Sequence, residues 1–484
     1  MSFVRDFSEH FRSYRHDVTE KARQYASGLM QGGSRKNMDR MAEVVPDSKS
    51  RNLQQFLTHS KWDARTVIDH VARETNEHLG DDQRAGFLID ESGFAKQGPM
   101  SVGVARQWLG RLGKVDNGQV AVFGVLADER LSVPVDVRLY LPKKWTGDPE
   151  RCDKAGIPED ERTFRTKDKL ALEIVAHARQ NGLRFGWVGA DGGYGKGPEF
   201  CLTLDRMGER FVVDLHTDFR VYLDVPQPYI PEKKGRGRKF TRYRIDAESL
   251  EVKDVIDRLK LKDRPILTLR NTSRGPLKVR VLRVPVYIWN EESAQVYCYS
   301  LVATRTLGRN PETKISLSNM PDTTDLKTLA WMQLQRYWVE RAFEDAKSEC
   351  GMADYQVRKW MAWHHHMALV MMVMLFMLKK RIQHKDSYPL LSCSDIEELL
   401  AHFLPRRDVS REEVIRQLER RHRKRLSAIT SHSRVSQQTQ SAEWPTSTVD
   451  LHYPVWKCHG LSRISYSSVY LSDKGGETVD YHRP

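Results

Sequence analysis

The chain has 484 residues, enough for roughly two to four folding units, and 39% of them are hydrophobic, which excludes wholesale disorder. Lysine and arginine outnumber aspartate and glutamate by 78 − 64 = 14, so a polyanionic partner such as nucleic acid is favoured. The six scattered cysteines form no CxxC pair and the N-terminus has no apolar signal segment, so neither a zinc site, a disulfide framework nor secretion is expected.

Residues 1–80 are predicted to form a polar helical domain that binds DNA. Gly32 and Gly33 close the first expected helix, and Ser34 is the expected N-cap of the next. The basic candidates for DNA contact are Arg35, Lys36, Arg40 and Lys49. A helical cap with a solvated basic surface explains the same pattern equally well, and both interpretations stay open.

Residues 81–217 have the pattern of a strand-rich catalytic core. Apolar strands are predicted at 85–90, on both sides of the turn "ADER" within 119–142, at 183–191 and at 209–216, with an amphipathic helix at 166–182. This order of three strands, a helix and two strands predicts a mixed sheet with helices packed on it. Asp90 and Asp191 each stand where an apolar strand ends.

Residues 218–310 are predicted to be a β-rich insertion with strands at 263–271, 277–290 and 294–306. A glycine-rich basic loop in it offers candidate phosphate contacts from Lys233, Lys234, Arg236, Arg238 and Lys239, although a solvated loop is the alternative.

The second part of the core is placed at 311–400, with a strand at 312–321, a helical region at 323–349 and a buried core helix at 367–378. The basic C-terminal region, 401–484, holds a very basic helix at 416–430 whose residues 416–425 are further candidates for phosphate contact, a linker at 431–450 and a strand-like tail at 453–472.

Asp90 and Asp191 would lie side by side if their strands are neighbours, and a third carboxylate from the helical region 323–349 would complete an oxygen-only site for Mg²⁺ or Mn²⁺. Two such ions about 3.5–4 Å apart can support phosphodiester cleavage. Taken alone, Asp90 could instead be a turn or cap residue. The "GGYGKG" that follows Asp191 lacks the spacing of a P-loop, so its glycines are interpreted as clearing space for nucleic acid or for the metal site.

Glu340 is the candidate for the third carboxylate. In a continuous helix, Arg336 lies about 40° and Lys347 about 20° from it, and Gln333 falls on the same side. Glu344, about 40° away, is the rival, whereas Asp345 at about 140° is expected to face solvent. An ordinary wet helix with an Arg336–Glu340 salt bridge is the alternative.

Taken together, these motifs resemble the DDE transposases of bacterial insertion sequences, in the branch with a large β-insertion and a Tyr-x2-Arg-x3-Glu-x6-Lys signature. Arg336, Glu340 and Lys347 fit that spacing, with Gln333 where the tyrosine would stand. "LIDESGFAKQG", "GADGGYGKG" and "ISLSNMP" also resemble the family, over roughly residues 20–380. The resemblance implies an α/β (mixed α+β) fold: a ribonuclease H-like mixed sheet flanked by helices and interrupted by the insertion.

The resemblance also implies roles. Asp90, Asp191 and Glu340 would be catalytic and bind two Mg²⁺ ions, for which Mn²⁺ can substitute, while Arg336 and Lys347 would hold DNA phosphates. Tyr299, or else Trp289, would stack on a flipped base, although either is commonly plain sheet core. His364, His365 and His366 point in different directions along a helix and are not expected to bind a metal.

The function expected is cut-and-paste transposition: binding of terminal inverted repeats, metal-dependent cleavage and strand transfer. Double-stranded DNA is the expected partner and a homodimer the expected synaptic state, in a bacterial cytoplasm at the nucleoid and without a membrane. Two alternatives remain, a transposase-derived DNA-binding protein without catalysis and a structure-specific, metal-dependent nuclease without strand transfer.

Overall fold

The computed structural model describes residues 3–441, except residues 15, 32, 34, 233–234, 236–239, 273–274 and 309. It divides into two compact units, Met1–Val409 and Ser410–Pro484, which are described separately. The predicted cap Ser34, the basic loop residues Lys233, Lys234, Arg236, Arg238 and Lys239, and the predicted strand tail at 453–472 lie outside the described residues.

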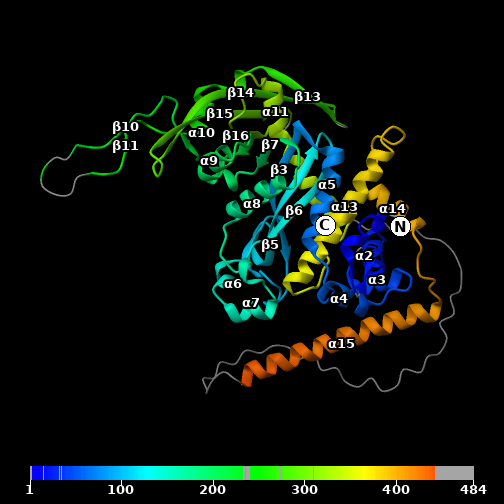
Figure 1. The fold of residues 1–484 in the computed structure, drawn as a ribbon. Coiled ribbons are helices and arrows are strands. Elements are labelled where there is room, and N and C mark those ends of the chain that lie inside the picture. Colours follow the sequence, from blue (N-terminus) through cyan, green and yellow to red (C-terminus); the bar gives the residue numbers. More distant parts are fainter. Residues whose placement is uncertain are drawn as a thin grey trace, which may run out of the picture. The chain divides into compact units, whose positions relative to one another are not determined.

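Five strands form the central part of the first unit (Figure 1). They are β3 (Asp81–Ala95), β5 (Lys114–Asp128), β6 (Leu131–Leu139), β7 (Phe185–Ala190) and β8 (Phe211–Asp214). β5 is antiparallel to β3 and to β6, whereas β7 is parallel to β3 and β8 is parallel to β7. The order β6-β5-β3-β7-β8 with these directions is that of the predicted ribonuclease H-like sheet, and the predicted fold class is confirmed.

Two helices make the crossovers that parallel pairing of β3, β7 and β8 requires. α8 (Lys167–Gln180) lies between β6 and β7 along the chain, and α9 (Glu199–Arg206) lies between β7 and β8. The Thr166 side chain caps α8 by accepting a hydrogen bond from the Lys169 backbone N–H (3.2 Å), and Gly182 follows its end with φ of +76°. The predicted helix at 166–182 is therefore confirmed.

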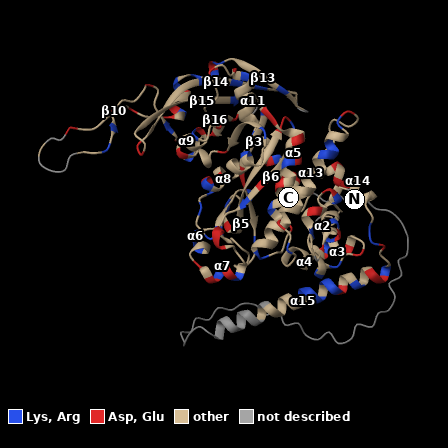
Figure 2. Cartoon of the chain, in the orientation of Figure 1, with Lys and Arg blue, Asp and Glu red and all other residues tan. Residues whose placement is uncertain are grey.

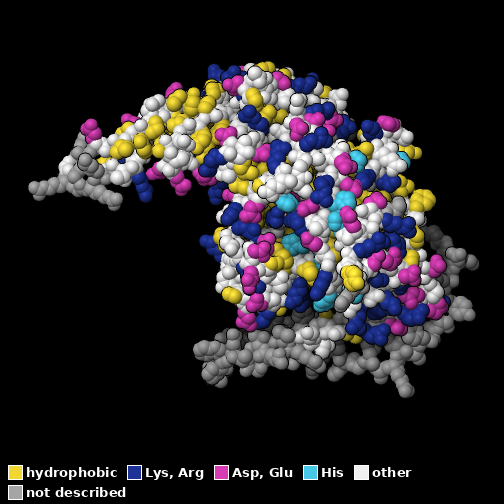
Figure 3. Space-filling model, in the orientation of Figure 1, with side chains coloured by type: hydrophobic (Ala, Val, Ile, Leu, Met, Phe, Trp, Pro, Cys, Tyr) yellow, Lys and Arg dark blue, Asp and Glu magenta, His cyan; other side chains and the backbone are white. Residues whose placement is uncertain are grey.

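The predicted strands of the insertion are present, and they extend the core sheet. β16 (Thr313–Ser318) pairs antiparallel with β8, and the sheet continues through β15 (Gln295–Thr306), β14 (Gly275–Asn290) and β13 (Ile266–Thr272). Figure 3 shows hydrophobic side chains gathered over this part of the molecule, around β14 and β15. Asp214, at the end of β8, thus lies between the core strands and the added ones.

Smaller elements complete the core and the insertion. β4 (Ala105–Leu109) pairs with β5 beside β6. The short strands of the insertion are β9 (Arg220–Val221), β10 (Pro228–Tyr229), β11 (Arg244–Ile245) and β12 (Leu250–Glu251). The remaining helices of these regions are η2 (Gly110–Leu112), α6 (Lys143–Thr146), α7 (Pro149–Ala155), η3 (Glu159–Glu161), η4 (Tyr194–Lys196), α10 (Val252–Arg258) and η5 (Leu261–Asp263).

The helical region predicted at 323–349 is two helices, α11 (Leu326–Gln335) and α12 (Tyr337–Ser348), that meet at Arg336. The backbone of Arg336 is close to helical, but its carbonyl accepts a hydrogen bond from the Val339 N–H three residues on (3.1 Å). This tighter turn changes the helical phase, because a three-residue turn advances each side chain by more than 100°. Gln333, which was expected on the side of Glu340, is buried against the added strands, where its amide contacts Ser316 and Thr304.

α13 (Trp360–Gln383) is the buried core helix that the sequence predicts at 367–378, and it packs on β6 and on N-terminal helices. Among the described residues it is the one helix long and apolar enough to cross a membrane, and 89% of its most apolar window is buried inside the protein. The N-terminal elements are α1 (Phe3–Asp6), η1 (Ser8–Phe11), β1 (Arg12–Ser13), β2 (His16–Asp17), α2 (Thr19–Gln31), α3 (Met38–Val44), α4 (Ser50–Thr58) and α5 (Ala64–Leu79). α14 (Cys393–Phe403) follows α13 and packs on α2.

Two of the three consecutive histidines of α13, His365 and His366, contact the N-terminal region. The ring nitrogens of His365 lie 2.9 Å from the Leu57 carbonyl oxygen and 2.8 Å from that of Trp62, and His366 Nδ1 lies 2.8 Å from the Tyr25 hydroxyl. Burial lowers the pKa of both histidines. They are therefore neutral packing residues at ordinary pH.

Lys36 corrects the list of DNA-contact candidates in the N-terminal region. Its side chain is buried, and its ammonium group donates to the Glu349 carbonyl oxygen and forms an ion pair with Glu397 (3.2 Å). The prediction that Lys36 contacts DNA was wrong, because a local pattern of basic residues does not show that another segment of the chain covers them. Arg40 is also engaged, in an ion pair with Glu43 (2.9 Å).

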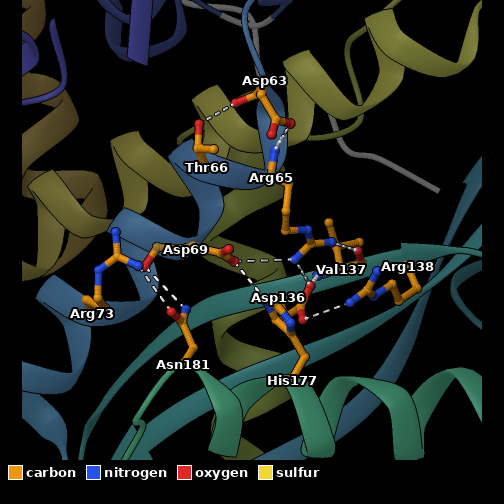
Figure 4. A network of polar contacts seen from close by, with 10 residues as sticks. All are labelled: Asp63, Arg65, Thr66, Asp69, Arg73, Asp136, Val137, Arg138, His177 and Asn181. Atoms are coloured by element: carbon orange, nitrogen blue, oxygen red, sulfur yellow. Dashed lines mark hydrogen bonds and ion pairs between the residues drawn. The ribbon is translucent and has the colours of Figure 1, made fainter. Parts of the chain in front are cut away.

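A polar network joins α5 to the sheet and to α8 (Figure 4). Arg65 donates to the buried carboxylate of Asp136 on β6 (2.5 Å) and to the Val137 carbonyl oxygen (3.3 Å). Asp69, one turn along α5, lies 2.9 Å from His177 Nε2 on α8. The contacts fix the last N-terminal helix against the core.

The described part of the second unit is α15 (Arg411–Ser441). It confirms the very basic helix predicted at 416–430, and Figure 2 shows lysine and arginine positions in blue along it. The linker predicted to begin at residue 431 was wrong for residues 431–441, which continue the helix. The Ser, Thr and Gln content that favoured a linker does not by itself stop a helix that has already begun.

Candidate active site

Three aspartates lie side by side at β3, β7 and β8, although the strand predicted to end at Asp90 continues beside β5 to Ala95. Asp90, Asp191 and Asp214 each follow a residue that is paired in register with its neighbours, in the row Ile89, Ala190 and Val213. Parallel strands bring their C-terminal ends to the same edge of a sheet, which is where α/β proteins place ligands. The inference that Asp90 and Asp191 lie on neighbouring strands is confirmed, and Asp214 adds a third carboxylate that sequence reasoning missed.

The loop after Asp191 is shaped by its glycines. The Gly193 backbone N–H donates to Asp191 Oδ1 (3.0 Å), and the N–H groups of Tyr194 and Gly195 donate to the Asp191 carbonyl oxygen (3.1 and 3.2 Å). A Cβ on Gly195 would collide with the carbonyl oxygen of Asp214. The glycines therefore let this loop close tightly around Asp191 and against β8.

Arg336 connects the carboxylates across the sheet edge to α12. Its Nε donates to Asp214 Oδ2 (3.1 Å), its Nη1 lies 3.5 Å from Asp90 Oδ2, and its Nη2 lies 2.9 Å from Glu340 Oε1. The Arg336 side chain is only 19% exposed, whereas that of Glu340 is 54% exposed. Glu340 is thus free to turn toward the aspartates.

A cleft of about 860 Å³ lies over this arrangement. Its acidic lining includes Asp90, Asp191 and Glu340, and its basic lining is formed by Arg336, Lys347 and Arg111. The exposed ring of Trp108 stands on the same wall. Carboxylates at the centre with cations around them suit a phosphodiester held beside a metal site.

The electrostatics of the cleft depend on burial. Burial, and next the Asp191 carboxylate beside it, raise the pKa of Asp90 to about 7, while Arg336 acts in the opposite direction. Burial, and next the positive charge of Arg111, lower the pKa of Lys347 to about 8. Both charged forms are disfavoured until a counter-charge arrives, a cation for Asp90 and an anion for Lys347.

The donor set fits a hard divalent cation, because every candidate ligand is a carboxylate oxygen. The repulsion that raises the pKa of Asp90 is what such an ion would relieve. In the structure, Arg336 supplies positive charge to Asp90 and Glu340. Within the described residues, the group that gathers three ligating atoms within 4.8 Å of one another is instead Glu9, His10 and His70, outside this cleft.

The other two acids of α12 differ from one another. Glu344, the rival of Glu340, lines the cleft with a 66% exposed side chain and forms an ion pair with Arg341 (3.0 Å). Asp345 was expected to face solvent, and that was wrong: it is buried and paired with Arg341 (2.7 Å). Cys393, at the start of α14, lies against it, so a later segment covers this side of the helix.

The two aromatic candidates have different surroundings. Tyr299 is buried, and its hydroxyl donates to Asp205 Oδ2 (3.1 Å), as expected for a sheet-core residue. Trp289 is partly exposed and lines a second cleft, of about 850 Å³, together with Lys196, His216 and Arg220. Base stacking by either residue stays a prediction, and of the two Trp289 has the more accessible ring.

Sequence reasoning missed Asp214 and two residues that line the cleft, Trp108 and Arg111. Asp214 carries the same signal as the other two aspartates, an acidic residue that ends the apolar run "FVV". Trp108 belongs to β4 and Arg111 to η2, a region for which no element was predicted. They line the cleft because β4 pairs with β5, a tertiary contact that their own sequence does not indicate.

Comparison with known proteins gives three kinds of match. A family model described as DDE superfamily endonuclease matches residues 6–276. The probable transposase for insertion sequence element IS701 from Microchaete diplosiphon is 25% identical over 362 residues, which are 74% of this chain and 82% of that protein.

Two solved structures resemble the chain remotely. A piggyBac transposase in a synaptic complex with hairpin DNA aligns with 83% of this chain and 75% of its own, at 9% identity and a TM-score of 0.37. The NurA nuclease from Sulfolobus solfataricus aligns with 69% of this chain and 98% of its own, at 11% identity and a TM-score of 0.21. The family match, in contrast, spans more than half of the chain and includes Asp90, Asp191 and Asp214.

Proposed function

Because the chain belongs to the DDE superfamily endonucleases, we propose that it is a transposase that cuts and joins the DNA of its own mobile element. It binds the terminal inverted repeats, cleaves the DNA with divalent metal ions and transfers the freed 3′-hydroxyl to target DNA. The observation that carries the proposal is the pair Asp90 and Asp191, which directly follow the last paired residues of the parallel strands β3 and β7, in one cleft with Glu340. The likeness to the IS701 protein supports transposition among the reactions of the family.

Asp90, Asp191 and Glu340 are the proposed ligands of two Mg²⁺ ions, for which Mn²⁺ would substitute. When bound, such ions activate the attacking oxygen and stabilise the leaving oxygen in phosphodiester cleavage and joining. The protein's own part is to hold the two aspartates in register and to let Glu340 swing in from α12. Enzymes of this superfamily use divalent metal ions, and the oxygen-only donor set agrees with that use.

DNA phosphates are proposed to lie against the basic wall formed by Arg336, Lys347 and Arg111. The partly exposed Trp289 is the proposed stacking partner for a flipped base, with Tyr299 second. Further phosphate contacts are proposed for the basic loop with Lys233, Lys234, Arg236, Arg238 and Lys239, and for α15.

A homodimer is proposed for the synaptic complex, because two ends must be held together before they are joined to one target. The reaction is placed in the bacterial cytoplasm, at the nucleoid where the DNA lies. The proposed arrangement of the chain keeps residues 1–80 for end binding, 81–217 and 311–400 for catalysis, 218–310 as the insertion, and 401–484 as a basic tail.

The test is cleavage of a labelled duplex that carries the element's end, with Mg²⁺ and separately with EDTA. Asp90→Asn, Asp191→Asn and Glu340→Gln should each lose at least about a thousandfold in cleavage rate, which is ~4 kcal/mol of transition-state stabilisation. End binding should survive in all three and weaken with rising salt. Glu344→Gln is the matched control, one turn further along α12, and should cleave like the wild type.

The outcomes separate the alternatives. Normal cleavage by all four variants would refute the metal site, whereas the absence of cleavage by the wild type as well, with end binding intact, would favour a DNA-binding protein without catalysis. A dead Glu344→Gln beside an active Glu340→Gln would move the third carboxylate to Glu344. Cleavage without joining of the 3′-hydroxyl to a target duplex would leave a nuclease without strand transfer.

A further inference from the structure

Asp214 is the carboxylate of the row that the proposed metal site does not use. It ends β8, its cross-strand partner on β16 is Ser316, and its side chain is only 16% exposed. Both of its oxygens are occupied: Oδ1 accepts a hydrogen bond from the Ser316 hydroxyl (2.6 Å), and Oδ2 accepts one from Arg336 Nε (3.1 Å). The Ser316 hydroxyl therefore fixes one oxygen of Asp214, and the other oxygen binds Arg336.

The Ser316 hydroxyl is itself fixed by a buried amide. Gln333 Nε2 on α11 donates to Ser316 Oγ (2.7 Å) and to the Val302 carbonyl oxygen (3.4 Å), while Gln333 Oε1 accepts from the Thr304 hydroxyl (2.5 Å). Thr304, Ser316 and Gln333 are each at most 2% exposed. Each hydroxyl donates a single hydrogen bond, so the bonds all run in one direction, from Thr304 through Gln333 and Ser316 to Asp214.

The hydrogen bonds that run from Thr304 to Asp214, called the relay below, end at the guanidinium of Arg336. Arg336 points a different nitrogen at each partner: Nε at Asp214, Nη1 at Asp90 and Nη2 at Glu340. Of these partners, Asp214 is bound on its far side by the buried relay, whereas the Glu340 side chain is about half exposed. Arg336 consequently has one permanent partner and two partners that can leave.

Burial raises the pKa of Asp214, while the Ser316 hydrogen bond and the charge of Arg336 both lower it. The carboxylate therefore depends on these two partners to remain a counter-charge for the guanidinium. A planar guanidinium with its Nε side fixed presents its two Nη groups in a defined direction, which suits recognition of a phosphate.

We infer that Asp214, oriented by Ser316 and Gln333, is a positioning residue. It keeps Arg336 aimed into the cleft when Asp90 and Glu340 turn away from Arg336 to bind the metal ions. The inference rests on the proposed function, because the phosphate beside the cut is what Arg336 is aimed at. Asp214 touches neither the DNA nor the reacting atoms and acts only through the Arg336 Nε. Through Ser316 and Thr304, the added strands β16 and β15 thereby set the geometry of a residue in the cleft.

The competing explanation is that the relay merely stabilises the junction of α11, β16 and β8. The two roles separate in kinetics. A stabilising network changes the amount of folded protein, whereas a positioning network changes the single-turnover rate of the folded protein. The equilibrium affinity for an end duplex in EDTA stays the same, since most phosphate contacts lie elsewhere.

The experiment measures the single-turnover cleavage rate of an end duplex, the Kd for that duplex in EDTA, and thermal unfolding. Asp214→Asn should lower the rate about tenfold or more, as expected for losing a charged hydrogen bond, with Kd within about twofold of the wild type. Ser316→Ala should lower the rate about threefold, a smaller effect because it removes a neutral donor. Asp136→Asn, which breaks the buried Asp136–Arg65 pair away from the cleft, is the matched control: it should lower the unfolding temperature without changing the rate of the folded protein.

Combining the substitutions then tests whether Ser316 affects the cleavage rate through Asp214 and Arg336. Adding Ser316→Ala to Asp214→Asn, or to Arg336→Lys, should change the rate no further, because lysine has no Nε–H for Asp214 to accept. A threefold loss that persists in both backgrounds would overturn the inference, as would a wild-type rate for Asp214→Asn. If Asp214→Asn does not fold, the Ser316→Ala and Arg336→Lys pair gives the same decision. Cleavage by Asp90→Asn would refute the proposed function, whereas a dead Asp90→Asn beside additive relay variants would refute the relay alone.

Discussion

The Cα of Gly195 lies so close to the carbonyl oxygen of Asp214 that a side chain at residue 195 would overlap it. Gly195 belongs to the loop that folds around Asp191, and Asp214 ends the neighbouring strand β8. The contact therefore packs the loop of Asp191, a predicted catalytic carboxylate, against Asp214, which binds Arg336. A small residue is needed here for packing, independently of any DNA contact.

The Gly195→Ala variant should therefore be destabilised. The added methyl group meets backbone, which cannot rotate away, so we expect a loss of about 1–3 kcal/mol or more in the free energy of unfolding. Gly197→Ala is the control, because Gly197 has an extended backbone and open space around its Cα. Thermal or urea unfolding of both variants provides the measurement, and equal midpoints would contradict the packing argument.

End binding should depend on pH through Lys347. Its pKa is lowered to about 8, so the free protein loses this positive charge as the pH rises through that value, and a bound phosphate must recover the proton. From about pH 7 to about pH 9, affinity for an end duplex should fall up to about tenfold from this group. Lys347→Arg should remove this part of the dependence, because arginine stays charged. Fluorescence anisotropy at constant ionic strength measures it, and identical pH profiles for the two proteins would exclude Lys347 from the interface.

Without metal, ionisation of Asp90 should cost stability. Its folded-state pKa, about 7, lies above the ordinary 3.8, so the folded protein binds the proton more tightly than the unfolded chain does. The stability contributed by protonated Asp90 is present at low pH and is lost as the pH rises through about 7.

Asp90→Asn should accordingly gain unfolding temperature relative to the wild type in EDTA, more at about pH 8 than at about pH 5. Adding Mg²⁺ should stabilise the wild type and have little effect on the variant. Glu340→Gln is the control, because it removes the charge of an exposed carboxylate in the same cleft. A difference in unfolding temperature that does not change with pH would show that Asp90 titrates normally.

The buried Asp345 should matter for stability and not for chemistry. Asp345→Asn weakens its pair with Arg341 in a covered site, and we expect a loss of about 1–3 kcal/mol in the free energy of unfolding. Glu344→Gln changes the exposed partner of the same arginine and should stay within about 0.5 kcal/mol of the wild type. Urea unfolding with cleavage assays on the same preparations would show the difference, and equal losses would place Asp345 on the surface.

Local patterns were enough to predict the elements around the site. The apolar runs that end at Asp90 and Asp191, and the amphipathic helix between residues 166 and 182, depend on side chains that are close in sequence. The connections predicted a mixed sheet but left open whether the strands of Asp90 and Asp191 are neighbours, which the parallel pairing of β3 with β7 decides. The same reasoning would have found Asp214, which ends its apolar run in the same way.

The sequence by itself therefore determined the strands, the core helices and the two carboxylates that follow apolar runs, since hydrophobic periodicity reflects which face of each element is buried. Only the tertiary structure decided which polar residues are covered. The added strands cover Gln333, α14 covers Asp345, and segments far along the chain bury Lys36. A charged or amide side chain looks the same in a sequence whether water or a distant part of the chain provides its partner, and that partner decides its role.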